Sequence, residues 1–136
     1  MFYVDSNIFL EVELKDPNWE DCKTVLDRIA NGSLEAVVST FHVYGIMLRI
    51  ETETRSAERI EKFLRAIDAF EGLRIYEATR QDWFKCLEIM RVSKLDFDDS
   101  LVVACMMSNG ANKLISLDAH FDKVKQIKRL EPKHVV

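Results

Sequence analysis

The sequence predicts an α/β fold in which helices cover both faces of a parallel β-sheet. The first observation is the run Phe2–Val4, which is β-prone and apolar without alternation, as is typical of a strand buried on both sides. The second is that short β-prone runs recur between helical patterns, at residues 35–38, 73–76 and 113–117. The carboxyl ends of parallel strands usually carry the functional site. We therefore expect Asp5, which directly follows the first run, to lie in such a site.

The length and composition predict a single domain that spans residues 1–136. A chain of 136 residues with 48% hydrophobic content can bury one sizeable core but not two. No apolar run approaches the roughly 20 residues that span a bilayer, and no signal-peptide pattern opens the chain. We therefore expect a cytoplasmic protein without a membrane partner. Cys22, Cys86 and Cys105 lie far apart within apolar patterns and are expected to be reduced core residues.

Helical patterns separate the β-prone runs. An amphipathic pattern covers Asn18–Ala30, and Ser39 is a good N-cap for a helix from Thr40 to about Glu51. This second helix is apolar nearly all round, so we expect it to be buried. Gly45 in its middle is unusual, because glycine destabilises a helix interior by about 1 kcal/mol relative to alanine.

Two further helices are expected before the next carboxylates. The pattern from Thr54 to Phe70 has one apolar and one charged face, which predicts a surface helix. Thr79 opens another helix, whose large apolar residues are expected to pack in the core rather than to stack on nucleic-acid bases. These residues are Trp83, Phe84, Leu87 and Met90.

Carboxylates gather at two further places in the sequence. The first group precedes an apolar helical run and contains Asp96, Asp98 and Asp99. Acidic residues are favoured at the start of a helix, where they cap backbone N–H groups and interact with the helix dipole. These effects explain one or two of the three aspartates, with Asp96 as the N-cap, but not all three. The second group, Asp118 and Asp122, follows the last β-prone run. The pattern of the first strand, which ends in an aspartate, is therefore repeated.

We infer that Asp5, Asp99 and Asp118 come together in the folded chain. Two of them end strands of one parallel sheet, and Asp99 lies in the first turn of the helix before the second strand. Clustered anions repel one another unless a cation neutralises them, and a set of carboxylate oxygens suits Mg²⁺ or Mn²⁺ rather than zinc. Such ions serve phosphoryl chemistry by activating water. The alternative is three unrelated capping or surface residues.

The ordered set of motifs resembles the PIN domain, a family that includes the VapC-type toxin ribonucleases. The segments that carry the resemblance are Val4–Asn7, Phe97–Leu101 and Ile115–Asp122, and they occur in the family's order over nearly the whole chain. The resemblance implies a three-layer α/β/α sandwich with a central parallel sheet of four to five strands. It also implies a homodimer, cleavage of RNA with Mg²⁺ or Mn²⁺, and a small antitoxin protein as partner.

Family roles carry over residue by residue. The implied catalytic residues, which are also metal ligands, are Asp5, Asp99 and Asp118, with Asp122 as an additional, less constant ligand. Asn7 and Ser116 match polar residues that support them. Asp99 is preferred to Asp98 because a small residue and a leucine follow it directly, as in the family.

One position departs from the family pattern. The family places a glutamate about six residues after the serine that opens the third helix, and counting from Ser39 this position is Gly45. Because that glutamate helps to hold the metal and to orient water, its absence is expected to weaken metal binding. His42 and Glu11 are candidate substitutes. The alternative is that His42 is a packed helix residue and that Glu11 is solvated.

A basic stretch near the C-terminus is a candidate RNA-binding rim, with an ordinary solvated surface as the alternative. Its basic residues are Lys123, Lys125, Lys128, Arg129 and Lys133, and Glu131 is the acid among them. The net charge of −4 argues against a protein that coats nucleic acid by bulk electrostatics.

Three classes of function remain. The first is a divalent-metal-dependent ribonuclease, the toxin of a toxin–antitoxin pair. The second is a PIN-like domain that has lost catalysis and binds RNA or a protein, for which Gly45 is the main support. The third is a small-molecule phosphatase or an oligomerisation module. It has little support, because the sequence contains no Gly-rich phosphate loop and no nucleophile motif.

Overall fold

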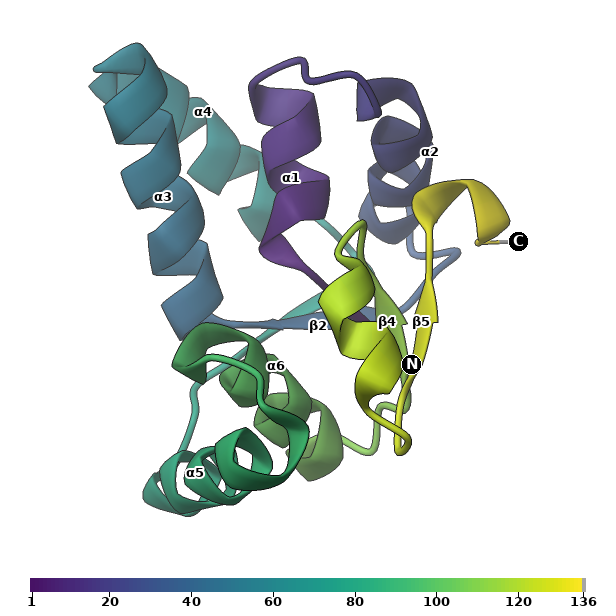
Figure 1. Ribbon diagram of the computed structural model, residues 1–136. Coiled ribbons are helices and arrows are strands. Elements are labelled where there is room, and N and C mark those ends of the chain that lie inside the picture. The colour runs from purple at the N-terminus through teal and green to yellow at the C-terminus, as the bar shows by residue number, and fades with distance from the viewer. Residues whose placement is uncertain (136) are drawn as a thin grey trace.

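The computed structural model describes residues 1–135 as helices that enclose a sheet of parallel strands (Figure 1). The strands are β1 (Phe2–Val4), β2 (Ala36–Ser39), β3 (Leu73–Tyr76), β4 (Lys113–Ile115) and β5 (Lys128–Leu130). The α-helices are α1 (Ser6–Glu13), α2 (Trp19–Ala30), α3 (Thr40–Thr54), α4 (Ala57–Asp68), α5 (Arg80–Ser93) and α6 (Phe97–Ser108). Two short 3₁₀ helices are η1 (Ala119–Lys123) and η2 (Pro132–His134).

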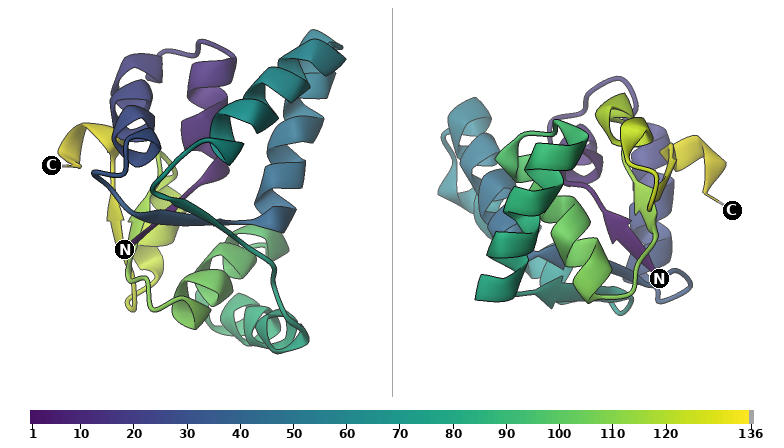
Figure 2. Two further views of the ribbon diagram at one scale, coloured as in Figure 1. Left: turned by 180° about the vertical axis from the view of Figure 1, so that it is seen from behind. Right: turned by 60° about the horizontal axis from the view of Figure 1, so that its bottom comes forward.

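The five strands pair in the order β3-β2-β1-β4-β5, and every pairing is parallel. Helices α1 to α4 lie on one face of the sheet and α5 and α6 on the other, as Figures 1 and 2 show from opposite sides. The predicted three-layer α/β/α sandwich is therefore confirmed. The strand order reverses direction at β1 and β4, and in open parallel sheets this switch point is where ligands bind.

The core surrounds the central strands. Tyr3, Val4, Val37, Val38 and Leu114 have no exposed surface. Because β1 has helices on both of its faces, its residues are apolar without alternation, as the sequence indicated. Cys22, Cys86 and Cys105 are buried and unpaired, which confirms that they are core residues. None of the helices in residues 1–135 has the length and hydropathy that crossing a membrane requires.

The prediction that helix α3 is buried nearly all round is wrong. Its buried face consists of His42, Val43, Ile46 and Ile50, whereas Phe41, Tyr44 and Leu48 are 46%, 56% and 63% exposed. The reason is positional, since α3 lies at the outer edge of its layer and packs on one side against α1 and α4 (Figure 1). Gly45 is on the exposed side.

The predicted buried face of helix α5 is wrong for three of its four residues, and the fourth, Met90, is half-buried. Trp83, Phe84 and Leu87 are 51%, 69% and 40% exposed. The buried side chains are instead those of Asp82, Cys86 and Ile89, at the helical spacing of a face that packs against α6. Burial of Asp82 in place of an aromatic residue is stabilised by hydrogen bonds from the hydroxyl groups of Tyr76, Thr79 and Ser108.

Candidate functional site

The site is built at the carboxyl ends of the neighbouring strands β1 and β4. In their register Val4 lies opposite Ile115, and Asp5, the residue that follows β1, donates its backbone N–H to the carbonyl of Ile115 at 3.0 Å. Asp118 follows β4 by three residues and is the N-cap of η1. Both aspartates therefore leave the same edge of the sheet, which the sequence predicted from their positions after β-prone runs.

Ser116 connects the two aspartates. Its hydroxyl donates to Asp5 Oδ2 at 2.5 Å and accepts from the backbone N–H of Asp118 at 3.0 Å and from Asn7 Nδ2 at 3.3 Å. Asp5 Oδ1 accepts from the backbone N–H of Ser6 at 2.8 Å. Asp5 is 7% exposed and Ser116 is fully buried, so this network fixes the carboxylate of Asp5 in one orientation.

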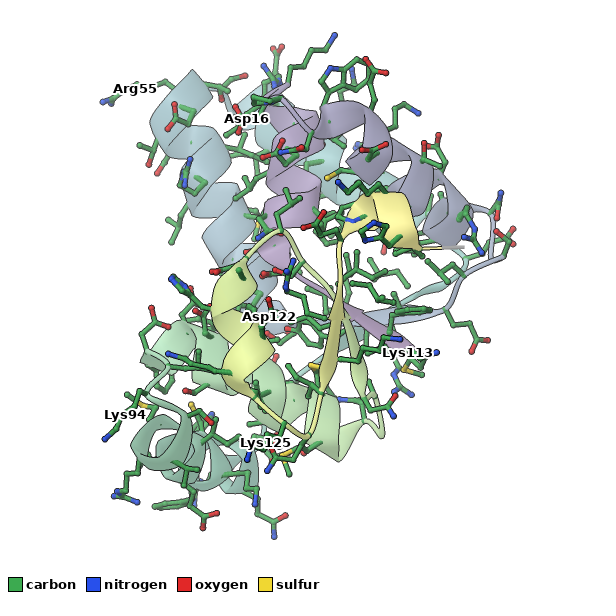
Figure 3. The ribbon with its side chains drawn as sticks, turned by 45° about the vertical axis from the view of Figure 1, so that its right-hand side comes forward. Asp16, Arg55, Lys94, Lys113, Asp122 and Lys125 are labelled. Atoms are coloured by element: carbon green, nitrogen blue, oxygen red, sulfur yellow. The ribbon has the colours of Figure 1, made fainter. Side chains whose placement is uncertain are left out.

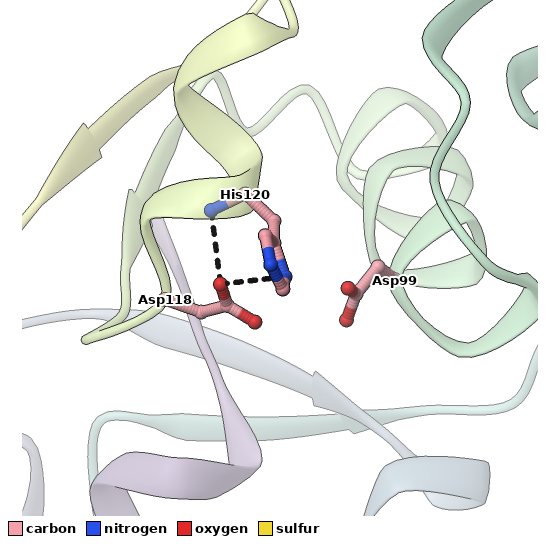
Figure 4. A group of neighbouring side chains, drawn as sticks. All are labelled: Asp99, Asp118 and His120. Carbon is pink, nitrogen blue, oxygen red and sulfur yellow. Dashed lines mark hydrogen bonds and ion pairs between the residues drawn. The ribbon is translucent and has the colours of Figure 1, made fainter.

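Helix α6 brings the third carboxylate to this edge. Asp96 is the N-cap of α6 and accepts from the backbone N–H of Asp99 at 2.9 Å, so the first turn of the helix presents Asp99. Oxygen atoms of Asp99 and Asp118 and a ring nitrogen of His120 all lie within 4.8 Å of one another. Figure 4 shows the His120 ring between the two carboxylates. These three residues are called the ligand group below.

His120 was not recognised from the sequence. Asp118 Oδ1 accepts from the backbone N–H of His120 and lies 2.9 Å from its Nδ1 (Figure 4). The available signal was the spacing of Asp118, Ala119 and His120, because a 3₁₀ turn folds the histidine back over a capping aspartate two residues earlier.

The electrostatics of the site show that its carboxylates interact. Burial, followed by the charges of Asp96, Asp5, Asp118 and Asp98, raises the pKa of Asp99 to about 7. Burial also raises the pKa of Asp5, although the hydroxyl of Ser116 and the nearby His42 oppose this effect. The metal-free site therefore has an excess of negative charge that a cation would relieve.

The donor atoms fit a divalent metal ion. Carboxylate oxygens predominate, as Mg²⁺ and Mn²⁺ prefer. The side-chain oxygen of Asn7 is buried and, within residues 1–135, accepts no hydrogen bond. Buried acceptors without a partner are uncommon and point to a missing ion or water. A metal with its bound water at this edge of the sheet accounts for both the carboxylates and this acceptor.

Comparison with known proteins identifies the family. The family model of the PIN domain matches residues 2–127. The chain belongs to the PIN domain family. A search of curated proteins found no match. The assignment agrees with the fold and with the place of Asp5, Asp99 and Asp118 at the switch point of the sheet.

Solved structures share this PIN fold at low sequence identity. The Mycobacterium tuberculosis toxin VapC20, which cleaves the sarcin–ricin loop, is 15% identical, with a TM-score of 0.74 over 92% of this chain and 95% of that one. A Klebsiella pneumoniae toxin–antitoxin complex is 12% identical, with a TM-score of 0.75 over 99% and 100% of the two chains. The Rickettsia felis VapBC2 complex, bound to a promoter DNA fragment, is 17% identical, with a TM-score of 0.68 over 96% and 98%.

The two candidate substitutes for the PIN glutamate have other partners. His42 is 3% exposed, its Nε2 lies 2.8 Å from an Asp98 carboxylate oxygen, and its Nδ1 lies 2.8 Å from the Tyr3 hydroxyl. Glu11 accepts from the backbone N–H of Asn18 at 2.8 Å. His42 therefore joins the starts of α3 and α6, and the contact with Asp98 leaves Asp99 as the carboxylate of that turn in the ligand group.

The structure also places the C-terminal residues of the predicted site. Asp122, labelled in Figure 3, forms a bidentate ion pair with Arg129 at 2.8 and 3.1 Å. Arg129, on β5, also donates to the carbonyl of Ser116 at 3.0 Å. The Nζ of Lys123 donates to the carbonyl of Lys94 at 3.3 Å. Lys125 and Lys128 are exposed, with no ion pair within residues 1–135.

Proposed function

We propose that this PIN domain is a divalent-metal-dependent endoribonuclease and the toxin component of a toxin–antitoxin pair. The observation that carries the proposal is the approach of Asp99 and Asp118 to one another beside the buried Asp5, at the switch point of the sheet. The toxins and toxin–antitoxin complexes among the structural neighbours support it. RNA is the proposed substrate. Lys128 lies opposite Lys113 at the amino ends of β5 and β4, away from the edge that carries the aspartates, so it is not assigned to the substrate-binding rim.

The chain's own residues prepare the site for phosphodiester cleavage. Asp99 and Asp118 would hold the metal directly, and Asp5 would complete its charge neutralisation from the end of β1, oriented by Ser116. When bound, a Mg²⁺ or Mn²⁺ ion supplies an activated water and stabilises charge on the phosphate oxygens. Asn7 donates to Ser116, and its own side-chain oxygen is buried and accepts no hydrogen bond within residues 1–135.

The test is the substitution Asp118→Asn. It keeps the acceptor for the His120 backbone N–H but removes a negative charge, so metal-dependent RNA cleavage should fall by at least 100-fold while the circular-dichroism spectrum is unchanged. Asp68→Asn, at an exposed position of α4, is the matched control and should retain full activity. Activity of Asp118→Asn equal to that of the parent would show that cleavage does not depend on this site.

The second candidate function is that of a PIN domain that has lost catalysis and binds RNA or a protein. The observation that favours it is Gly45, at the position of the family glutamate. A Cβ added at Gly45 meets no atom within 4 Å, so packing does not require glycine there. Gly45→Glu and Gly45→Ala should both stabilise α3 by about 0.5–1 kcal/mol. If the missing carboxylate limits catalysis, only Gly45→Glu should increase RNA cleavage and the affinity for Mn²⁺. Equal behaviour of the two variants would exclude position 45 from the metal site.

A homodimer is proposed through the exposed apolar surface of α3 and the start of α6. Phe41, Tyr44 and Leu48 are exposed on α3, and Phe41 packs edge-to-face against Phe97, which is 41% exposed. A contiguous apolar surface of this kind marks a protein interface, and a second copy would cover it beside the start of α6. Sedimentation should show a dimer that Tyr44→Glu dissociates. Leu64→Glu, on α4, is the control and should leave it intact.

The antitoxin is assigned to a groove of about 1100 Å³ between α1, α2 and α4. Phe9, Leu26 and Phe63 form part of its floor, and Lys15 and Lys62 lie on its rim. An apolar floor with charged edges suits an amphipathic helix. Co-expression with a small protein encoded beside this chain should yield a complex. The double variant Lys15→Glu and Lys62→Glu should bind this small protein more weakly. An unchanged affinity would show that the groove is not the docking site.

A further inference from the structure

The proposed metal centre lacks a ligand from helix α3. At the position of the family glutamate, α3 carries Gly45. His42 borders the site but is paired with Tyr3 and Asp98, and Glu11 accepts from the backbone N–H of Asn18. Within residues 1–135, the ligand group takes its third member from the other side of the site, from η1. His120 is therefore the side chain that could supply the ligand that α3 lacks.

The backbone holds His120 in place even though its side chain is 73% exposed. The next residue, Phe121, is fully buried, and Val124 at the end of η1 is 3% exposed, so the turn is anchored in the core. Asp118 caps the turn through the backbone N–H of His120 at 2.9 Å. The imidazole thus projects from a fixed turn toward the two carboxylates (Figure 4).

The contact with Asp118 indicates which ring nitrogen of His120 faces the ligand group. Nδ1 lies 2.9 Å from Asp118 Oδ1, which is about the separation of two neighbouring ligands that each lie about 2.1 Å from one ion. Nδ1 is therefore the ring nitrogen that can share an ion with Asp118, because Nε2 lies on the far side of the ring from that carboxylate.

The distances are compatible with one shared ion. Ligands at about 2.1 Å from a metal lie at most roughly 4.2 Å apart. The ligand atoms of Asp99, Asp118 and His120 lie within 4.8 Å of one another. Closing the remaining few tenths of an ångström needs only a small side-chain rotation, which the exposed position of His120 permits.

We propose that His120 is a metal ligand in this chain and takes the place of the α3 glutamate, so that the centre has mixed nitrogen and oxygen donors. Imidazole suits transition-metal ions better than Mg²⁺, and affinity for such sites rises from Mn²⁺ to Co²⁺. The centre should therefore prefer Mn²⁺ and Co²⁺ over Mg²⁺. This inference rests on the metal centre of the proposed function and specifies its ligands and its ion preference.

Calorimetric titration of the full chain with Mg²⁺, Mn²⁺ and Co²⁺ tests the proposal. His120→Ala should weaken Co²⁺ binding by at least tenfold, Mn²⁺ binding by a smaller factor, and Mg²⁺ binding by less than twofold. His134→Ala, at an exposed histidine on η2, is the matched control and should change none of them. His120→Asp should restore Mg²⁺ and Mn²⁺ binding but not the preference for Co²⁺. Equal losses for all three ions in His120→Ala would overturn the proposal.

A spectroscopic measurement separates direct ligation from an indirect effect. Electron spin echo modulation from a ring nitrogen should appear with Mn²⁺ bound to the parent and to His134→Ala, and should be absent in His120→Ala. Its absence in the parent would overturn the role of His120 even if Asp118-dependent RNA cleavage is found. Nitrogen modulation without RNA cleavage would support the ligand while refuting the proposed ribonuclease. A parent that binds none of the ions would refute both.

Discussion

Asp99→Asn is expected to stabilise the metal-free protein at pH 8. Burial and the charges of neighbouring aspartates raise the pKa of Asp99 from 3.8 to about 7. At about 1.4 kcal/mol for each pH unit, this difference sets an upper limit of about 4 kcal/mol for the cost of ionising Asp99 in the folded state. Solvent screening of a half-buried carboxylate, and the favourable helix-dipole interaction that the variant also loses, reduce the expected gain to about 1–2 kcal/mol.

The sign of the pH dependence follows from linkage. Between pH 3.8 and about 7 the folded state binds the Asp99 proton more tightly than the unfolded state, so the stability of the parent falls as the pH rises through this window. The asparagine of the variant does not titrate. The two unfolding free energies should therefore converge near pH 4 and diverge up to pH 8.

Urea unfolding in EDTA at a series of pH values measures this difference. Asp98→Asn is a control of opposite sign, because the hydrogen bond from His42 lowers the pKa of Asp98 and its removal should destabilise the fold at pH 8. Adding Mn²⁺ at 100 times its Kd should stabilise the parent by about 2.7 kcal/mol and Asp99→Asn by less. An Asp99→Asn protein that is no more stable than the parent at pH 8 in EDTA would refute the carboxylate repulsion.

Three further predictions concern the scaffold. Ser116→Ala should destabilise the fold by about 1–3 kcal/mol at pH 8, measured by urea unfolding, because the buried Asp5 loses its hydroxyl donor. For Asp82, burial raises the pKa, but hydrogen bonds from Ser108, Thr79 and Tyr76 outweigh it and hold the pKa below its usual value. This stabilisation is present above the unfolded pKa and is lost as the pH falls through the folded pKa, so melting curves of Asp82→Asn should lie below those of the parent at neutral pH and approach them in acid. Lys94→Gly should stabilise the fold by about 0.5–1 kcal/mol and so raise its melting temperature, because Lys94 ends α5 in the left-handed conformation with φ of 60°. A lower melting temperature would count against backbone strain at this position.

The sequence alone was sufficient to predict the parallel sheet and the aspartates at its edge. These features depend on local patterns. The apolar run of β1 requires helices on both faces, and an aspartate that directly follows a strand must leave the sheet at its carboxyl edge. Asp5 and Asp118 could therefore be placed near one another without knowledge of the rest of the fold. Asp99 followed from its position in the first turn of an apolar helix.

The face that each helix buries was decided by the tertiary structure. An apolar residue can lie in the core or at an interface, and composition does not distinguish the two. Phe84 and Leu48 are exposed because α5 and α3 pack against their neighbours through other faces, which include the polar residues Asp82 and His42. These polar residues could be buried because partners distant in sequence, such as Ser108 and Tyr3, satisfy their hydrogen bonds.

The partners of the charged residues were likewise decided by packing. Arg129, in a basic stretch of the sequence, is paired with Asp122 because β5 lies beside η1, and His120 joins the acidic site because η1 folds back over the end of β4. Sequence motifs name the residue types of a site, but electrostatic interactions depend on distances of a few ångströms. Those distances are set by how strands and turns far apart in the chain pack together, which the sequence determines only through the complete fold.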